Sequence, residues 1–382
     1  MGRFRDVELD DVELTGDRLL LRRWQPTDAD AVFAIMQDES MFEFLALPRP
    51  YTQDAARDFV ERFGHEGRGE GTGIGCAVVE RSSGRVVGSA AIRQLSGHCD
   101  VGYWVAPAAR GHRYAAEATG LLAAWGFEHG VHRIELLCDV RNLASIRTAL
   151  AAGFGYEGVN RGYDCGPADE TGARSPVDVA RFARLRTDPG RPIAPRFPPL
   201  AAERLGDGVI GLRMLRPADV PGWLEQEHDE LTLRYAFDAA VPPDDALAGT
   251  VIRAGLEWLV GSVARFTIED VASGAYAGMV SLRNSGPPQV GGIGYAVHPA
   301  FRGRGYTARA LRLLAPWAFD VAGFARLELG AKVANVGSQK AALAGGFVPE
   351  AMREHRLRNP DGTFGDEVRY VLINSSAARA GS

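Results

Sequence analysis

The chain contains two copies of one sequence pattern, and this internal repeat limits its architecture more than any other feature. Matching residues are 191 positions apart near the start of the copies, 192 in the middle and 193 near the end. Similar composition alone does not produce so constant a spacing. Two copies of one fold are therefore expected. The matching residues are Leu21/Leu212, Arg22/Arg213, Pro26/Pro217, Asp28/Asp219, Gly102/Gly294, Tyr103/Tyr295, Val105/Val297, Trp125/Trp317, Phe127/Phe319, Asn142/Asn335, Ser145/Ser338, Gly153/Gly346 and Phe154/Phe347.

A proline-rich segment separates the two copies. It holds prolines at 189, 192, 195, 198 and 199, and proline disfavours both helix interiors and inner strands. Such a composition is typical of a semi-rigid linker. A chain of 382 residues is also long enough for two domains of ordinary size. We predict an N-terminal domain over 1–187, a linker over 188–205 and a C-terminal domain over 206–382, arranged as an internal pseudo-dimer.

Composition argues against several classes of partner. The formal net charge is -5 and the pI is about 6.0, so no positive field is available for nucleic acid or an acidic membrane surface. We find neither an apolar signal segment nor a run long enough to span a bilayer. The four cysteines form no CxxC pair, which indicates neither a zinc site nor a disulfide framework. We expect a cytoplasmic protein without a metal, either a monomer or a homodimer.

Within each copy, strand and helix patterns alternate, which predicts an α+β fold with a mixed, mostly antiparallel sheet flanked by helices. In the first copy we expect strands over 18–24, 75–80, 86–93, 101–107 and 134–140. Helices are expected over 29–36, capped by Asp28, and over 115–129 and 142–154. The second copy repeats this order, with a hairpin over 266–283 and a helix over 308–320. Pro316 should kink or break that helix.

The run Arg302-Gly-Arg-Gly-Tyr-Thr307 lies between an expected strand and an expected helix. A strand that leads through glycines into a helix N-terminus leaves several backbone N–H groups unpaired at the positive end of the helix dipole. This arrangement suits a pyrophosphate, and glycine allows close approach of the anion. The alternative is a tight turn whose arginines face solvent.

The same run resembles the acyl-CoA-binding motif of the GNAT superfamily of N-acetyltransferases, Arg/Gln-x-x-Gly-x-Gly/Ala. Downstream, Asn335-x-x-Ser338 with Gly346-Phe347 is similar to the second motif of that superfamily, especially in the branch that acetylates the N-termini of ribosomal proteins. Both motifs occur in order in both halves. The resemblance covers residues 18–185 and 208–373.

The resemblance implies that two neighbouring strands, here 292–299 and 326–333, splay apart and hold the arm of acetyl-CoA between them. An amine would attack the acetyl carbon directly, with backbone donors near Val297 polarising the thioester carbonyl. Asn335 would bind the arm, and Ser338, or Ser145 in the first copy, would protonate the leaving thiolate. Asn and Ser are equally good helix caps, and both roles can coexist. The implied acetyl-CoA residues are Val297, Arg302, Gly303, Arg304, Gly305, Tyr306, Thr307 and Asn335, with Val105, Arg110, Gly111, His112, Arg113, Tyr114, Ala115 and Asn142 in the first copy.

The first copy departs from the motif at Arg113, which replaces Gly305. A side chain there would crowd the phosphate, force a different backbone or pair with the phosphate itself. Thr307, in a small-residue position, is a milder departure in the second copy. We therefore favour the C-terminal domain as the active one.

Other candidate residues carry less weight. Cys138 lies seven residues before Ser145, near the expected CoA sulfur, but a buried cysteine also serves as a small apolar residue. His98 and Asp100 stand where a general base is expected, although the second copy has Val290 and Gly292 there. His228 belongs to an acidic stretch. Water can also relay the amine proton.

The predicted function is acetyl transfer from acetyl-CoA to a primary amine, either a small molecule or a protein N-terminus. The acceptor site is expected where the copies differ most, at 40–51 and 162–178 in the first and at 232–245 and 353–367 in the second. The alternative is an acyl-CoA-binding sensor or scaffold without catalysis in one or both domains.

Overall fold

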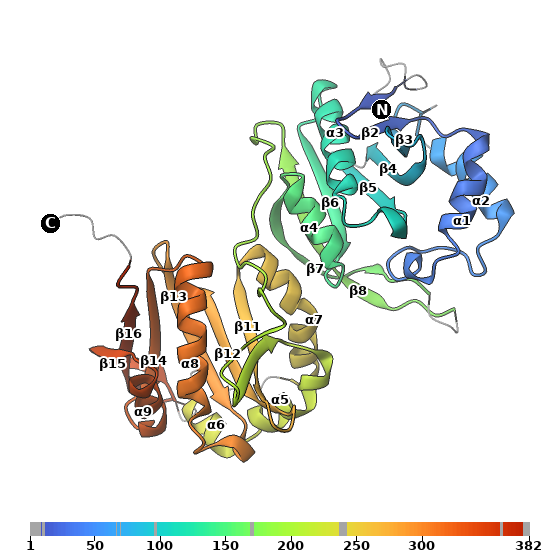
Figure 1. The fold of residues 1–382 in the computed structure, drawn as a ribbon. Coiled ribbons are helices and arrows are strands. Elements are labelled where there is room, and N and C mark those ends of the chain that lie inside the picture. The colour runs from blue at the N-terminus through green and yellow to red at the C-terminus, as the bar shows by residue number, and fades with distance from the viewer. Residues whose placement is uncertain are drawn as a thin grey trace. The chain divides into compact units, whose positions relative to one another are not determined.

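The chain divides into two compact units, Met1–Ala194 and Pro195–Ser382, in the computed structural model (Figure 1). The structure describes residues 9, 12–65, 67–68, 70–94, 98–168, 172–236, 243–359 and 362–376. Parts of the segments expected to form the acceptor sites, 169–171, 237–242 and 360–361, lie outside the described residues.

The first unit is an eight-stranded sheet in the order β1-β2-β3-β4-β5-β6-β8-β7, flanked by four α-helices among its described residues. Its strands are β1 (Leu14–Thr15), β2 (Leu19–Arg22), β3 (Gly73–Glu80), β4 (Val86–Gln94), β5 (Cys99–Val105), β6 (Arg133–Asp139), β7 (Gly155–Cys165) and β8 (Pro176–Leu185). Its helices are α1 (Ala29–Ile35), α2 (Gln53–Glu61), α3 (Tyr114–Glu128) and α4 (Leu143–Ala151), with 3-10 turns η1 (Pro26–Asp28), η2 (Glu39–Met41), η3 (Phe63–His65) and η4 (Pro107–Ala109).

The second unit repeats this order as β9-β10-β11-β12-β13-β14-β16-β15. Its strands are β9 (Arg204–Gly206), β10 (Ile210–Met214), β11 (Val263–Asp270), β12 (Tyr276–Asn284), β13 (Val290–Val297), β14 (Arg326–Lys332), β15 (Val348–Arg358) and β16 (Phe364–Ile373). Its helices are α5 (Val220–Glu227), α6 (Glu230–Tyr235), α7 (Asp244–Val260), α8 (Tyr306–Pro316) and α9 (Val336–Ala344), with turns η5 (Pro217–Asp219), η6 (Pro299–Phe301) and η7 (Trp317–Val321).

The α+β prediction is confirmed in both units. Among the described strands, only β5 with β6 and β13 with β14 pair in parallel, and the other pairs are antiparallel. A parallel pair needs a long crossover, which α3 and α8 supply by packing along one face of their sheets. The mixed, mostly antiparallel sheet therefore follows from a single crossover helix in each unit.

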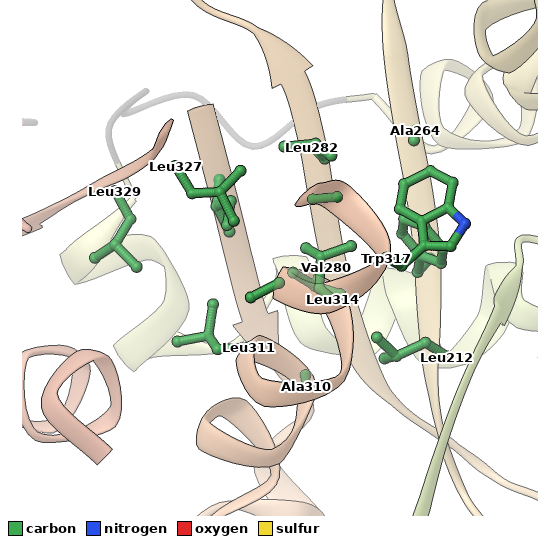
Figure 2. Packing of buried hydrophobic residues seen from close by; sticks show 14 of the residues in the cluster. Leu212, Ala264, Val280, Leu282, Ala310, Leu311, Leu314, Trp317, Leu327 and Leu329 are labelled. Carbon is green, nitrogen blue, oxygen red and sulfur yellow. The ribbon is translucent and has the colours of Figure 1, made fainter. Parts of the chain in front are cut away.

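Helix α8 covers the core of the second unit, as Figure 2 shows. Leu311 and Leu314 of α8 are fully buried together with Leu327 of β14 and Val280 of β12. The α-helix ends at Pro316 and continues as the π-helical turn η7. Proline has no N–H to donate to the preceding turn, and at Pro316, where a kink or break was expected, the α-helical hydrogen-bond pattern changes to a π-helical one.

An arginine–aspartate pair explains the first repeated motif. In the first unit, Arg22 donates two hydrogen bonds to Asp28, at 2.8 and 2.9 Å, and in the second Arg213 donates two to Asp219, both at 2.8 Å. Asp28 accepts from the backbone N–H of Gln25 at the start of η1, and its side chain makes no cap bond to α1. The Asp28 side chain therefore does not cap α1 as expected. It closes the turn η1 instead and is bound by Arg22 of the neighbouring strand β2.

The Asp219 carboxylate should make the second domain sensitive to acid. Burial alone would raise the pKa of Asp219, but hydrogen bonds from Arg213, Thr267 and the backbone of Arg216 outweigh it, so the pKa lies below its usual value. A lowered folded-state pKa contributes stability that is complete above the unfolded pKa of about 3.9 and disappears as pH falls through the folded pKa.

We therefore expect the urea midpoint of the second domain to fall between pH 5 and pH 3. Unfolding can be followed by the proteolytic sensitivity of that domain in the full chain. In Asp219→Asn the carboxylate is absent, so this decrease should be smaller. An equal decrease in the variant would assign the acid sensitivity to other groups.

The segment between the copies is anchored at both ends. The backbone N–H of Ile193 donates to Leu150 in the first unit, and that of Arg196 donates to Leu259 in the second. Phe197 is fully buried, with ring centroids 6.0 Å from Trp258 and 6.3 Å from Phe324. The part of the proline-rich segment around Phe197 therefore belongs to the core of the second unit and is not a linker, because the Phe197 ring packs between core side chains.

Candidate functional site

The two parallel strands at the centre of each sheet diverge. In the second unit β13 and β14 pair only where Val290–Gly292 face Arg326–Glu328, and in the first unit β5 and β6 share two pairs. Beyond these pairs, β13 stays bonded to β12 and β14 to β16. The expected splay is present in both copies. The facing edges of the strands leave backbone donors and acceptors available to a third, extended chain.

The loop after β13 forms a cradle of backbone donors. Gly303 and Gly305 have φ angles of 76° and 73°, in the left-handed region that glycine enters without strain. Within the described part of the chain, the N–H groups of residues 303–308 donate to no protein acceptor. They lie at the start of α8, whose dipole makes this end positive. The loop can therefore bind a phosphate or pyrophosphate through its backbone.

The first unit keeps this backbone despite its different sequence. Gly111 has a φ of 83°, and Arg113 has a φ of 61° where the second copy has Gly305. Arg113 does not force a different loop, so the substitution places a long side chain on an unchanged backbone. A left-handed conformation costs a non-glycine residue about 1–2 kcal/mol. Strain of this kind persists where surrounding structure imposes it, often at functional sites.

A tyrosine at the first helical position anchors each loop. The Tyr306 hydroxyl donates to Asp270 at the end of β11, and the Tyr114 hydroxyl donates to Glu80 at the end of β3, at 2.5 Å. The hydrogen bond to Asp270 raises the pKa of Tyr306. Both hydroxyls are thus used inside the protein, while the backbone N–H groups of these tyrosines remain available to a ligand.

The arginines of the loops differ in their surroundings. The guanidinium of Arg302 binds Asp229, the N-cap of α6, and Thr232 in its first turn, and that of Arg110 donates to Ser40 Oγ at 2.9 Å. Arg304 instead lies over the ring of Phe301, 5.0 Å from its centroid. In the first copy His112 stacks on Tyr114. The remaining predicted loop residues, Thr307 and Ala115, stand in the first turns of α8 and α3, and Val297 and Val105 end β13 and β5.

In each unit a hydroxyl pair joins one of the diverging strands to the helix that follows the other. The Tyr295 hydroxyl on β13 lies 2.8 Å from Ser338 Oγ on α9, and the Tyr103 hydroxyl on β5 lies 2.7 Å from Ser145 Oγ on α4. Burial raises the pKa of Tyr295, so its hydroxyl stays protonated at neutral pH. The repeated Gly-Tyr dipeptides were visible in the sequence, but nothing there indicated which residue the tyrosine would meet.

The two asparagines act as helix caps. Asn335 Oδ1 accepts from the backbone N–H of Ser338, and Asn142 Oδ1 accepts from that of Ser145, both at 3.0 Å. Capping fixes the serine hydroxyls at the first turns of α9 and α4. The cap role is therefore present in both copies, and a bond from Asn335 or Asn142 to a ligand remains a prediction.

The other candidates have protein partners of their own. Burial raises the pKa of the Cys138 thiol to about 12, so the thiol is not a thiolate at neutral pH. Asp100 is bound by Arg93, and His98 lies 3.5 Å from Glu135. His228 follows α5 directly. We find no group of three or more His, Cys, Asp or Glu suited to a metal among the residues described, and no described helix is long and apolar enough to cross a membrane.

A comparison with known protein families identifies the family of both units. A sequence profile of the acetyltransferase (GNAT) domain matches residues 18–155 and again residues 210–348. The chain belongs to the GNAT acetyltransferase family. Its two GNAT domains correspond to the two copies seen in the sequence, so the predicted resemblance is confirmed.

Relatives of the GNAT domains include the uncharacterized N-acetyltransferase YoaA of Bacillus subtilis (strain 168), 28% identical over 154 residues, which cover 39% of this chain and 86% of YoaA. A GNAT-family acetyltransferase from Bacillus anthracis has a TM-score of 0.40 at 14% identity, covering 44% of this chain and 98% of its own. RimL, a ribosomal-protein alpha-N-acetyltransferase in complex with coenzyme A, has a TM-score of 0.41 at 20% identity, covering 46% and 100%.

Proposed function

We propose that this protein transfers an acetyl group from acetyl-CoA to a primary amine, with the C-terminal domain as the favoured catalytic centre. The observation that carries this proposal is the hydroxyl pair of Tyr295 and Ser338, which joins β13 to α9, the helix after β14, in the unit that also holds the cradle of N–H groups. The cradle suits a pyrophosphate and the splayed edges suit an extended arm, so the hydroxyls would lie near the sulfur of a bound thioester.

The residues divide into two groups by task. The N–H groups of residues 303–308 would bind the pyrophosphate, and the unpaired edge of β13 up to Val297 would bind the arm and polarise the carbonyl. The amine nitrogen attacks the acetyl carbon, the carbon–sulfur bond breaks, and the electron pair leaves with sulfur. The amine proton passes to water.

The leaving thiolate needs a proton, and the hydroxyl pair can supply one. Ser338 would donate it and recover one from Tyr295, which in turn takes a proton back from solvent. Burial raises the pKa of Tyr295, so the hydroxyl carries its proton before the thiolate leaves. A positioned acid of this kind contributes about 10²- to 10⁴-fold to a rate. Asn335 would keep the serine in place through its cap.

The C-terminal domain is favoured because Gly305 adopts the left-handed loop conformation freely, whereas Arg113 does so under strain. The same strain supports the alternative for the first domain, acetyl-CoA binding without catalysis. The acceptor is a small-molecule amine or a protein N-terminus, the second in line with the substrate named for RimL.

Calorimetry with acetyl-CoA on the full chain, combined with release of free CoA in the presence of amines, tests the proposal. The amine panel contains a peptide with a free α-amine, an aminoglycoside and an alkyl amine. Binding with amine-dependent release of CoA supports the proposal. Binding without release from any amine favours the sensor function, and absence of binding contradicts both.

A further inference from the structure

Both ends of helix α6 are bound by side chains from the diverging strands and their loops. One side chain comes from the loop after β13, and the other comes from β14. At its start, Arg302 of the loop after β13 binds the carboxylate of Asp229, and it also donates to Thr232 Oγ1 at 2.9 Å. At its end, the ammonium of Lys332 on β14 donates to the carbonyl oxygen of Arg234 at 3.2 Å. Figure 1 shows α6 at the same end of the second sheet as the start of α8.

The charges of these residues match the ends of the helix. Asp229 caps α6 by accepting from the backbone N–H of Thr232 at 2.9 Å, and the hydrogen bond from Arg302 lowers the pKa of Asp229. Lys332 is only 6% exposed and forms no ion pair within the described chain. Its positive charge instead meets the negative end of the α6 dipole. The carbonyl oxygen at this helix end therefore takes the place of the carboxylate that a buried lysine usually has as its partner.

We propose that α6 is fixed across the end of the second sheet at which β13 and β14 diverge, and we call this fixed helix the bar. In this proposal Arg302 is a positioning residue for the bar and not a phosphate ligand. The proposal rests on the proposed function, because α6 begins the segment expected to line the acceptor site. The loop that would bind acetyl-CoA is then rigidly connected, through one guanidinium, to the helix beside the acceptor. Acceptor binding depends on this connection, whereas acetyl-CoA binding depends on the backbone of the loop.

The first domain contains only half of this arrangement. Arg110 reaches the turn η2 by donating to Ser40, and Asp38 caps that turn by accepting from the backbone N–H of Ser40. At the other end Asp139 replaces Lys332, and it is bound by Arg141. The turn in the first domain is a single 3-10 turn, η2, without a lysine at its end. A bar held at both ends is therefore a feature of the C-terminal domain.

Hydrogen exchange of residues 230–236 in the full chain tests the bar without requiring a known acceptor. The variants are Arg302→Ala, Asp229→Ala, their combination and Lys332→Met. Each single variant should speed exchange by about 10- to 100-fold, the range expected for loss of a hydrogen bond to a charged group. The double variant should add little to Arg302→Ala, because both changes remove the same contact.

Arg304→Ala is the matched control, since Arg304 is in the same loop but lies over Phe301 and should leave this exchange unchanged. Calorimetry on the same proteins separates the two roles of Arg302. An acetyl-CoA affinity within about three-fold of the wild type, together with faster exchange, supports the bar. Unchanged exchange with an affinity loss of ten-fold or more overturns it. If the wild type binds no acetyl-CoA, the proposed function fails, and the exchange results alone decide whether α6 is held as described.

Discussion

Replacing Gly305 by glutamate is expected to abolish acetyl-CoA binding by the C-terminal domain, with an affinity loss of at least about 100-fold. Gly305 has a φ of 73°, and a Cβ at this position would meet no atom within 4 Å, so the side chain enters open space beside the cradle. A carboxylate there would face the phosphates, and juxtaposed like charges cost several kcal/mol. Backbone strain adds about 1–2 kcal/mol.

Gly305→Arg is the matched control, because Arg113 shows that an arginine can adopt this backbone in the same fold. It introduces comparable strain with the opposite charge and should retain most of the affinity. Calorimetric stoichiometry of the full chain, measured for wild type and both variants, separates charge from strain. Equal losses of acetyl-CoA affinity in the arginine and glutamate variants would show that backbone strain at this position, and not the charge of the side chain, weakens binding.

Tyr295→Phe is expected to lower kcat by about 100-fold while the Kd for acetyl-CoA stays within a few-fold, because the hydroxyl is needed only when the thiolate leaves. Ser338→Ala should have a similar effect, and the double variant should lose little more than either single one. Single-turnover release of CoA measures the chemical step directly.

Tyr370→Phe provides a control of the same chemical change. Tyr370 is buried and its hydroxyl donates at 3.3 Å to Gln339, the residue after Ser338, and not to the Ser338 hydroxyl. Its loss should leave kcat near the wild-type value. If Tyr295→Phe also leaves kcat unchanged, Ser338 is a structural residue at the start of α9, and the proton for the thiolate comes from solvent.

Much of the fold follows from local signals in the sequence. The repeat predicts two copies, the alternation of strand and helix patterns predicts the order of elements, and the glycine loop predicts the start of α8. The α-helical pattern of α8 changes to a π-helical turn after Pro316, which has no N–H to donate. These features depend on neighbouring residues and on the period of apolar side chains, which is why they can be read without a structure.

The contacts of the candidate site escape such reasoning because their partners are distant in the chain. Tyr295 meets Ser338 across 43 residues, and Arg302 meets Asp229 across 73. The sequence indicated Arg302 and Ser338 as separate residues of two motifs, and it gave no reason to link either to its actual neighbour. Similarly, the strained backbone of Arg113 depends on the whole loop being held in place, which the substitution alone does not reveal.

Phe197 determines where the protein can be divided. Its ring is stacked 6.4 Å from that of Trp317 and lies in the core of the second unit, although it precedes the first residue of the second repeat match by 15 positions. A polypeptide that starts at residue 206 would lack this ring and would be destabilised by at least about 3 kcal/mol, as for loss of a buried phenylalanine. A fragment meant to contain the second GNAT domain alone, or to fuse it to another protein, must therefore start no later than Pro195 and include part of the proline-rich segment.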